Sequence, residues 1–203
     1  MTAALQLPPV GSLRGITIAT VLGLLFSTGL RISEVLALDI CNFYPQTSRL
    51  FVAKGKFRKE RWVPLSTSTN DALMSYVKQR EQFMLLTPDS PVFINTWKRR
   101  LQSQNVSKTL PTLLAQCDIS ANATYRPRLH DLRHSFAVRR LLRWYQQGAD
   151  VNNKLPHLAT YLGHVNIRST QVYLHAIPEL QQLVCKRSSD YFHQHILGMG
   201  GML

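Results

Sequence analysis

The sequence of 203 residues is poor in cysteine and has less than half as many acidic as basic residues. Its three cysteines, Cys41, Cys117 and Cys185, lie far apart, and no two of them form a CxxC pair. Scattered cysteines in an odd number disfavour a disulfide scaffold and a cysteine-rich zinc site, and they are typical of a protein from a reducing cytoplasm.

Long hydrophobic runs and repeats are also lacking. The longest uncharged stretch, the sixteen residues between Arg14 and Arg31, is shorter than the roughly 20 apolar residues of a membrane-spanning helix. Its flanks do not fit a signal peptide, so we interpret it as a buried core helix. No Gly/Ser linker divides the chain, and 45% hydrophobic residues suffice for a core. The sequence therefore predicts one globular domain over residues 1–203, with no membrane segment.

Positive charge, in contrast, is abundant. The chain has 24 Lys and Arg against 11 Asp and Glu, a net charge of +13. Residues 54–61, 98–100 and 126–143 together carry +12 of this charge. Charge concentrated in this way favours a polyanionic partner, most often nucleic acid, and the alternative is a solvated basic surface.

Hydrophobic periodicity predicts a mainly helical α+β domain with a small antiparallel β-sheet. Two β-prone runs, residues 49–53 and 61–65, flank a basic segment and predict a hairpin with a charged tip. Asn70 or Asp71 is the expected cap of the third helix, and residues 198–203 are expected to fray. Helices are expected over about residues 13–27, 31–36, 70–86, 103–117, 130–148, 155–162, 169–175 and 178–195.

The chain contains residue types that can break and rejoin a phosphodiester without a metal. Arginines bind the extra negative charge of the transition state, a tyrosine can hold a covalent phosphoryl group, and lysine or histidine can move protons. The candidates for these roles are Arg31, Lys54, Lys56, His130, Arg133, His164 and Tyr173.

Four motifs in this order resemble those of the tyrosine recombinases, also called phage-type integrases. They are TGLRISEVLAL at residues 28–38, KFRKERWVPL at 56–65, HDLRHSFA at 130–137, and LGH at 162–164 followed by STQVY at 169–173. The resemblance covers about residues 14–195 and implies the catalytic-domain fold of that family.

The resemblance also implies a role for each matching residue. Arg31 and Arg133 would clamp the scissile phosphate, and His164 would bond a non-bridging oxygen. Tyr173 would attack to give a 3′-phosphotyrosine and a free 5′ hydroxyl, with His130 assisting proton transfer at the tyrosine. The family uses no metal and no other cofactor, because the phosphotyrosine conserves the energy of the broken bond.

The general acid and the DNA contacts are less closely specified. Lys56 best matches the lysine that protonates the leaving 5′ oxygen, and Lys54 is the alternative. Tyr161 and Tyr125 are less favoured alternatives to Tyr173 as nucleophile. The cations expected to contact double-stranded DNA are Lys54, Arg58, Lys59, Arg61, Arg126 and Arg128.

Three further side chains are expected to support the site. We expect His134, four residues after His130, to support the site and not to act in catalysis, the alternative being a bond to core backbone. Glu34 and Asp131 are expected to orient neighbouring catalytic groups through hydrogen bonds. A rival interpretation takes His130 and His134 as the two histidines of an HExxH zinc helix, although Asp131 occupies the glutamate position and Arg133 lies in the same turn.

The first motif begins within thirty residues of Met1, which leaves no room for the N-terminal core-binding domain that most family members carry. We therefore expect a catalytic domain alone, with weak, salt-dependent DNA binding. The resemblance implies a tetramer on paired DNA sites, formed through residues 178–195 from a free monomer. It also implies a recombinase of a mobile element in the bacterial cytoplasm, associated with the nucleoid; the alternative is a truncated, non-catalytic DNA-binding remnant.

Overall fold

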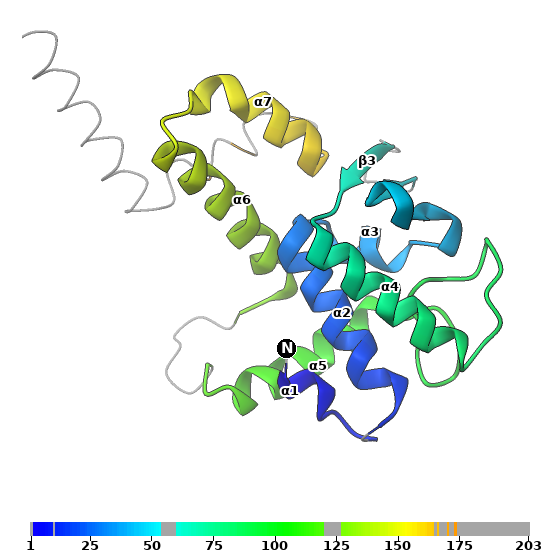
Figure 1. Ribbon diagram of the computed structural model, residues 1–203. Helices are drawn as coiled ribbons and strands as arrows, with labels where there is room; N and C mark the ends of the chain where they lie inside the picture. The colour runs from blue at the N-terminus through cyan, green and yellow to red at the C-terminus, as the bar shows by residue number, and fades with distance from the viewer. Residues whose placement is uncertain are drawn as a thin grey trace, which may run out of the picture. The chain divides into compact units, whose positions relative to one another are not determined.

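The computed structural model describes residues 2–9, 11–53, 60–119, 127–164, 166, 170 and 173. The chain divides into two compact units, Met1–Phe136 and Ala137–Leu203, and each is considered by itself. Figure 1 shows the order of the elements along the chain. The helices of the described residues are α1 (Thr2–Leu5), α2 (Leu13–Thr28), α3 (Ile32–Leu36), η1 (Ile40–Asn42), η2 (Pro45–Thr47), α4 (Thr67–Glu81), α5 (Ser103–Gln116), α6 (Leu129–Gln146) and α7 (Val151–Leu162).

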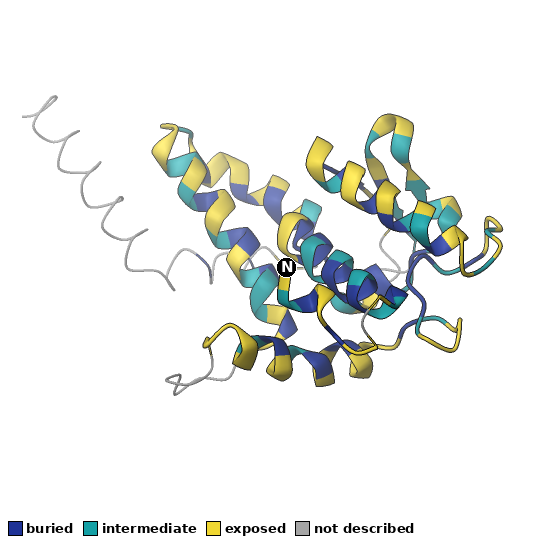
Figure 2. Ribbon diagram, turned by 60° about the horizontal axis from the view of Figure 1, so that its bottom comes forward, coloured by how far each residue is buried: buried dark blue, intermediate teal, exposed yellow. Residues whose placement is uncertain are grey.

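Helix α2 forms the centre of the N-terminal unit. It packs against α1, α3 and α4, and residues on several of its sides are buried, among them Val21, Leu24 and Leu25. Figure 2 shows the buried positions as dark stripes along the helices, with exposed positions on their other sides. A helix that is apolar nearly all round is stable only inside a core, so the expectation of a buried core helix here is confirmed.

A small antiparallel sheet lies in the same unit. Strand β1 (Phe43–Tyr44) pairs with β2 (Arg49–Val52), and β2 pairs with β3 (Arg61–Pro64), in the order β1-β2-β3. The β2–β3 hairpin was expected, whereas β1 was not, because a strand of two residues is too short to show periodicity. The expectation of a mainly helical fold with a small antiparallel sheet is confirmed.

The start of α4 differs from the expectation that Asn70 or Asp71 caps it. The helix begins at Thr67, and the side chain of its N-cap, Ser66, accepts a hydrogen bond from the Thr69 backbone. The Asn70 side chain is buried and donates instead to the Pro45 carbonyl at 3.2 Å. A tertiary contact thus occupies the residue that local pattern marked as a cap.

Helix α7 also begins earlier than residue 155. Asp150 caps it by accepting a hydrogen bond from the Asn153 backbone at 3.2 Å. The expected helix 178–195 and the frayed tail lie outside the described residues, as does most of 169–175. No helix in the described part of the chain is long and apolar enough to cross a membrane.

We predict that Gly29→Ala destabilises the protein more than Gly11→Ala. Both glycines have left-handed backbone, with φ of 65° and 79°, so each substitution costs about 1–2 kcal/mol of strain. A Cβ at residue 29 would also lie 2.5 Å from Cδ1 of Phe136, whereas one at residue 11 would meet nothing within 4 Å. This clash adds about 1–3 kcal/mol. Urea denaturation midpoints measure both losses, and equal losses would contradict the prediction.

Candidate active site

Arg31 lies at the N-cap of α3, immediately after the turn that ends α2. Its backbone is extended, with φ −73° and ψ 147°. The backbone N–H of Arg31 donates to Oε2 of Glu34 at 2.9 Å, and its Nη1 donates to Oε1 of Glu34 at 3.0 Å. One carboxylate therefore holds both the main chain and the guanidinium of Arg31.

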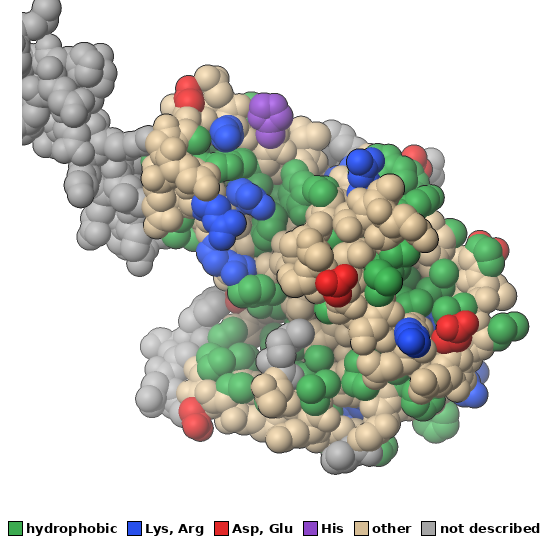
Figure 3. Space-filling view, in the orientation of Figure 1, with side chains coloured by type: hydrophobic (Ala, Val, Ile, Leu, Met, Phe, Trp, Pro, Cys, Tyr) green, Lys and Arg blue, Asp and Glu red, His purple; other side chains and the backbone are tan. Residues whose placement is uncertain are grey.

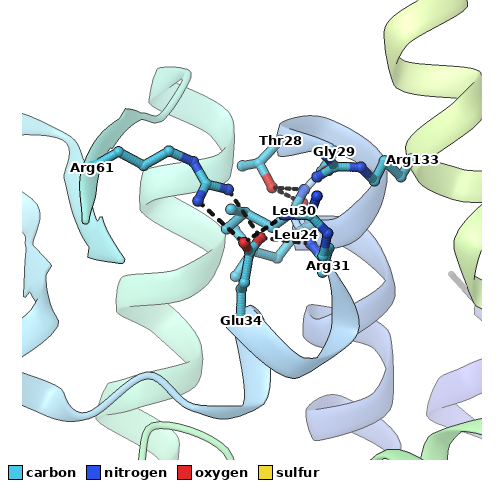
Figure 4. A network of polar contacts seen from close by, with 8 residues as sticks. All are labelled: Leu24, Thr28, Gly29, Leu30, Arg31, Glu34, Arg61 and Arg133. Atoms are coloured by element: carbon cyan, nitrogen blue, oxygen red, sulfur yellow. Dashed lines mark hydrogen bonds and ion pairs between the residues drawn. The ribbon is translucent and has the colours of Figure 1, made fainter. Parts of the chain in front are cut away.

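The same carboxylate binds Arg61 of β3. Nη1 and Nη2 of Arg61 donate to Oε1 and Oε2 of Glu34 at 3.1 and 2.9 Å, a bidentate pair. Figure 4 shows Arg61 and Arg31 approaching Glu34 from opposite sides. Arg61 was expected to contact DNA, and the structure places its side chain, 10% exposed, against Glu34. The expectation that Glu34 orients its neighbours matches this geometry.

Glu34 is ionised although it is 2% exposed. Burial, the largest single influence, raises the pKa of its carboxyl, and the hydrogen bonds from the Arg61 side chain and the Arg31 backbone lower it. Together with the two positive charges, they hold the pKa below the ordinary value of 4.5. A buried carboxylate that stays charged keeps both arginines in place at neutral pH.

Arg133 reaches the same turn from α6. Its side chain is buried, and its Nη1 donates to the Gly29 carbonyl at 2.8 Å. Figure 4 shows the Arg133 side chain reaching Gly29, two residues before Arg31. The structure therefore brings together the two arginines expected to clamp the phosphate, which are 102 positions apart in the sequence.

His130 lies in the first turn of α6, near both arginines. Its ring packs edge-on against the ring of His134, with centroids 4.6 Å apart. Burial lowers the pKa of His130 below the ordinary 6.5, and electrostatic repulsion from His134, Arg133 and Arg31 lowers it further, against the opposing charge of Asp131. The ring is therefore neutral at pH 7 and able to accept a proton. The structure thus places His134 beside His130.

Asp131 stabilises the start of α6. Its Oδ2 accepts a hydrogen bond from the Arg128 backbone at 2.6 Å, which caps the helix that carries His130 and Arg133. Through this cap the carboxylate helps to position the helix that carries both residues.

In the C-terminal unit, His164 and Tyr173 lie close together. His164 follows Gly163, whose left-handed backbone ends α7. The two rings are nearly parallel, with centroids 6.3 Å apart, and Tyr173 is buried. Nδ1 of His164 lies 2.7 Å from Oγ1 of Thr170, which is also buried. Thr170 was not among the residues expected in the site, and its position one helical turn before Tyr173 is the sequence signal that marks it. Tyr161, the alternative nucleophile, lies half-buried on α7.

The expected DNA contacts are described only in part. Arg128 is exposed, whereas Lys54, Lys56, Arg58, Lys59 and Arg126 lie outside the described residues, as does Tyr125. Figure 3 shows Lys and Arg side chains gathered over α6, where the exposed arginines are Arg139, Arg140 and Arg143.

The basic segment 98–100 divides between two environments. Lys98 and Arg99 are exposed. Arg100 is half-buried and donates to the carbonyls of Leu36 and Leu38 at 3.0 and 3.2 Å, and to the Asp39 carboxylate. Arg100 thus stabilises the chain after α3.

No group of three His, Cys, Asp or Glu side chains within the described residues could hold a metal ion. The His130–His134 pair of the zinc-helix interpretation is therefore without a third protein ligand in that part of the chain.

Comparisons with known proteins agree on one family. Residues 5–179 match the phage integrase family. A protein of Sinorhizobium fredii described as an integrase/recombinase, y4rE, is 38% identical over 92% of this chain and 59% of its own length. Tyrosine recombinase XerD of Staphylococcus epidermidis is 33% identical over 85% of this chain and 55% of its own. This chain thus spans less than two thirds of the length of either relative.

Solved structures share the fold. XerH recombinase bound to its palindromic difH substrate after cleavage has a TM-score of 0.67 at 17% identity, over 90% of this chain and 48% of that one. XerA recombinase has a TM-score of 0.64 at 22% identity, over 89% of this chain and 57% of that one.

We predict that Glu34→Gln destabilises the protein by about 3 kcal/mol at pH 7, because it breaks a buried ion pair. The contribution of Glu34 is full above pH 4.5, its ordinary pKa, and is lost as the pH falls through its lower folded pKa. The difference in free energy of unfolding between the wild type and Glu34→Gln is therefore constant above pH 4.5 and becomes smaller below it.

Urea denaturation at a series of pH values measures this gap. Glu81→Gln, which changes an exposed carboxylate on α4, is the matched control and should shift stability by less than about 0.5 kcal/mol. Equal effects of the two substitutions, or a gap that widens in acid, would contradict the prediction.

Proposed function

This chain belongs to the phage integrase family, and on that premise we propose that it is the catalytic domain of a site-specific DNA recombinase. It cuts and rejoins DNA strands through a covalent 3′-phosphotyrosine at Tyr173. The observation that carries the proposal is the meeting of Arg31, Arg133 and His130 around the turn after α2. Two cations beside a proton acceptor suit a phosphodiester, whose reaction concentrates negative charge on its non-bridging oxygens.

Strand cleavage begins at the phenol of Tyr173. Its proton passes to the neutral ring of His130, and the phenolate oxygen attacks the scissile phosphorus. The bond from phosphorus to the 5′ oxygen then breaks, and Lys56, or alternatively Lys54, protonates the leaving oxygen. Rejoining is the reverse, with a 5′ hydroxyl attacking the phosphotyrosine.

The remaining residues stabilise charge or hold the reacting groups. Arg31 and Arg133 bind the non-bridging oxygens, and His164 donates a further hydrogen bond to one of them. The contact of His164 Nδ1 with Thr170 supports this role, because a partner at one ring nitrogen orients the other. Glu34 acts as a positioning residue, since its carboxylate binds the side chains of Arg31 and Arg61.

The substrate in this proposal is double-stranded DNA. The +12 charge in three basic segments supports it, and binding should weaken steeply with salt because neutralised phosphates release their counterions. We further propose a free monomer that assembles into a tetramer on paired sites. The host process is integration, excision or inversion of a mobile element in the bacterial cytoplasm, at the nucleoid.

We predict that the protein forms a denaturant-resistant complex with nicked DNA carrying element-end sequences, and that chelator leaves it intact. Tyr173→Phe abolishes the complex, because phenylalanine lacks the attacking oxygen. Tyr161→Phe, the matched control, retains it. Gel electrophoresis under denaturing conditions measures the covalent band.

Either of two outcomes would contradict the mechanism: a band that persists in Tyr173→Phe, or one that is lost with chelator. Salt-sensitive binding without any band, on the element-end DNA of the parent element, would instead indicate a non-catalytic DNA-binding remnant.

We predict that Lys56→Met lowers cleavage of ordinary DNA by about 10²–10⁴-fold, the usual contribution of a general acid. A substrate with sulfur in place of the bridging 5′ oxygen should restore the rate, because a thiolate leaves without protonation. Trapping yields on the two substrates measure this rescue. Rescue of Lys54→Met in place of Lys56→Met would reassign the general acid to Lys54.

A further inference from the structure

The outward face of the sheet β1-β2-β3 is unusual in composition. Side chains alternate between the faces of a strand, and on one face Leu50, Val52 and Val63 are at most 2% exposed. The other face presents Tyr44, Arg49, Phe51, Trp62 and Pro64. The solvated face of an antiparallel sheet is normally polar, whereas this one carries three aromatic rings.

The three rings form one continuous surface. Trp62 lies directly opposite Phe51 in the register, and their ring centroids are 5.0 Å apart at 50°. Tyr44 packs edge-on against Trp62, also at 5.0 Å. Tyr44 remains 42% exposed and Trp62 49% exposed, so the cluster leaves much of its aromatic surface to solvent.

The outward face carries a positive charge, and the sequence that joins β2 to β3 is basic. Arg49 is exposed and lies opposite both Tyr44 and Pro64 in the register. None of the five outward residues is acidic. The chain between β2 and β3 contains four cations, at 54, 56, 58 and 59, against the single acid Glu60. A nucleic acid, whose phosphates are anionic and whose bases have flat faces, fits this combination better than a protein surface does.

We propose that this outward face is a stacking platform for unpaired DNA bases. The inference rests on the proposed function, because a cleaved strand must leave its complement before it joins another. Trp62 is the residue after Arg61, which turns to the opposite face and binds Glu34 beside Arg31. The platform thus lies on the face of β3 opposite the arginine cluster, and it would bind bases of an unpaired strand that passes from that cluster to the outer face of the sheet.

Cross-strand aromatic pairs also stabilise sheets, so the test must separate stacking from folding. The probes are an oligothymidine of about 12 nucleotides and an abasic strand of the same length, within the range of known single-strand sites. The two probes carry the same phosphates and differ only in their bases. The ratio of their dissociation constants therefore measures base stacking, independently of the basic segments.

We expect the wild-type chain to bind oligothymidine about tenfold more tightly than the abasic strand, the effect of one well-stacked base. Trp62→Val, which retains β propensity, should reduce the ratio to about one without changing the affinity for the abasic strand. Tyr44→Thr, at an edge position, should reduce it partly. The matched control is Trp97→Val, since Trp97 is 81% exposed and precedes Lys98 and Arg99 but lies outside the sheet.

Three outcomes would overturn the platform proposal. The first is a wild-type chain that binds oligothymidine and the abasic strand equally well. The others are folded Trp62→Val and Tyr44→Thr variants that keep the wild-type preference for oligothymidine, or a Trp97→Val variant that loses this preference as much as Trp62→Val does. Urea midpoints identify the variants that remain folded. Covalent trapping on nicked duplex tests the proposed function separately. A covalent complex on nicked duplex, together with equal binding of the two single-stranded probes, would reject only the platform proposal. Tighter binding of oligothymidine without any covalent complex would reject only the proposed recombinase function.

Discussion

One buried carboxylate organises the arginines of the N-terminal unit. Glu34 receives hydrogen bonds from the backbone and side chain of Arg31 and from both terminal nitrogens of Arg61. Burying a carboxylate destabilises a protein unless both of its oxygens accept hydrogen bonds, and both oxygens of Glu34 do so here. Removing either arginine would leave the other bound to an under-compensated carboxylate, so the start of α3 and strand β3 depend on each other.

The turn after α2 joins this cluster to α6. Gly29 adopts the left-handed conformation that ends α2, and its carbonyl accepts the hydrogen bond from Arg133. Glycine is needed here for two reasons: the left-handed backbone disfavours a side chain, and Phe136 occupies the space where a Cβ would lie. Arg133 and Phe136 are one helical turn apart, so a single face of α6 both closes over the turn and delivers a guanidinium to it.

The same sheet has two chemically different faces. Alternation along β3 directs Arg61 toward the carboxylate, where it is bound, and directs Trp62 to the outside, among other rings. The inner face therefore contributes to the arginine cluster, and the outer face is available to a partner. Because the side-chain period of a strand is two residues, a slip of one residue would exchange these two environments.

Local pattern in the sequence determined the helices α2, α5 and α6, the β2–β3 hairpin, and the arginine, histidine and tyrosine residues of the motifs, because periodicity and motif spacing act over a few neighbouring residues. Only the tertiary structure decided that Arg61 binds Glu34, 27 positions away, and that Arg133 binds the Gly29 carbonyl, 104 positions away. It likewise decided that Asn70 contacts Pro45 in place of capping α4. These contacts depend on strand register and on how the helices pack, and neither is encoded in the residues next to each partner in the chain.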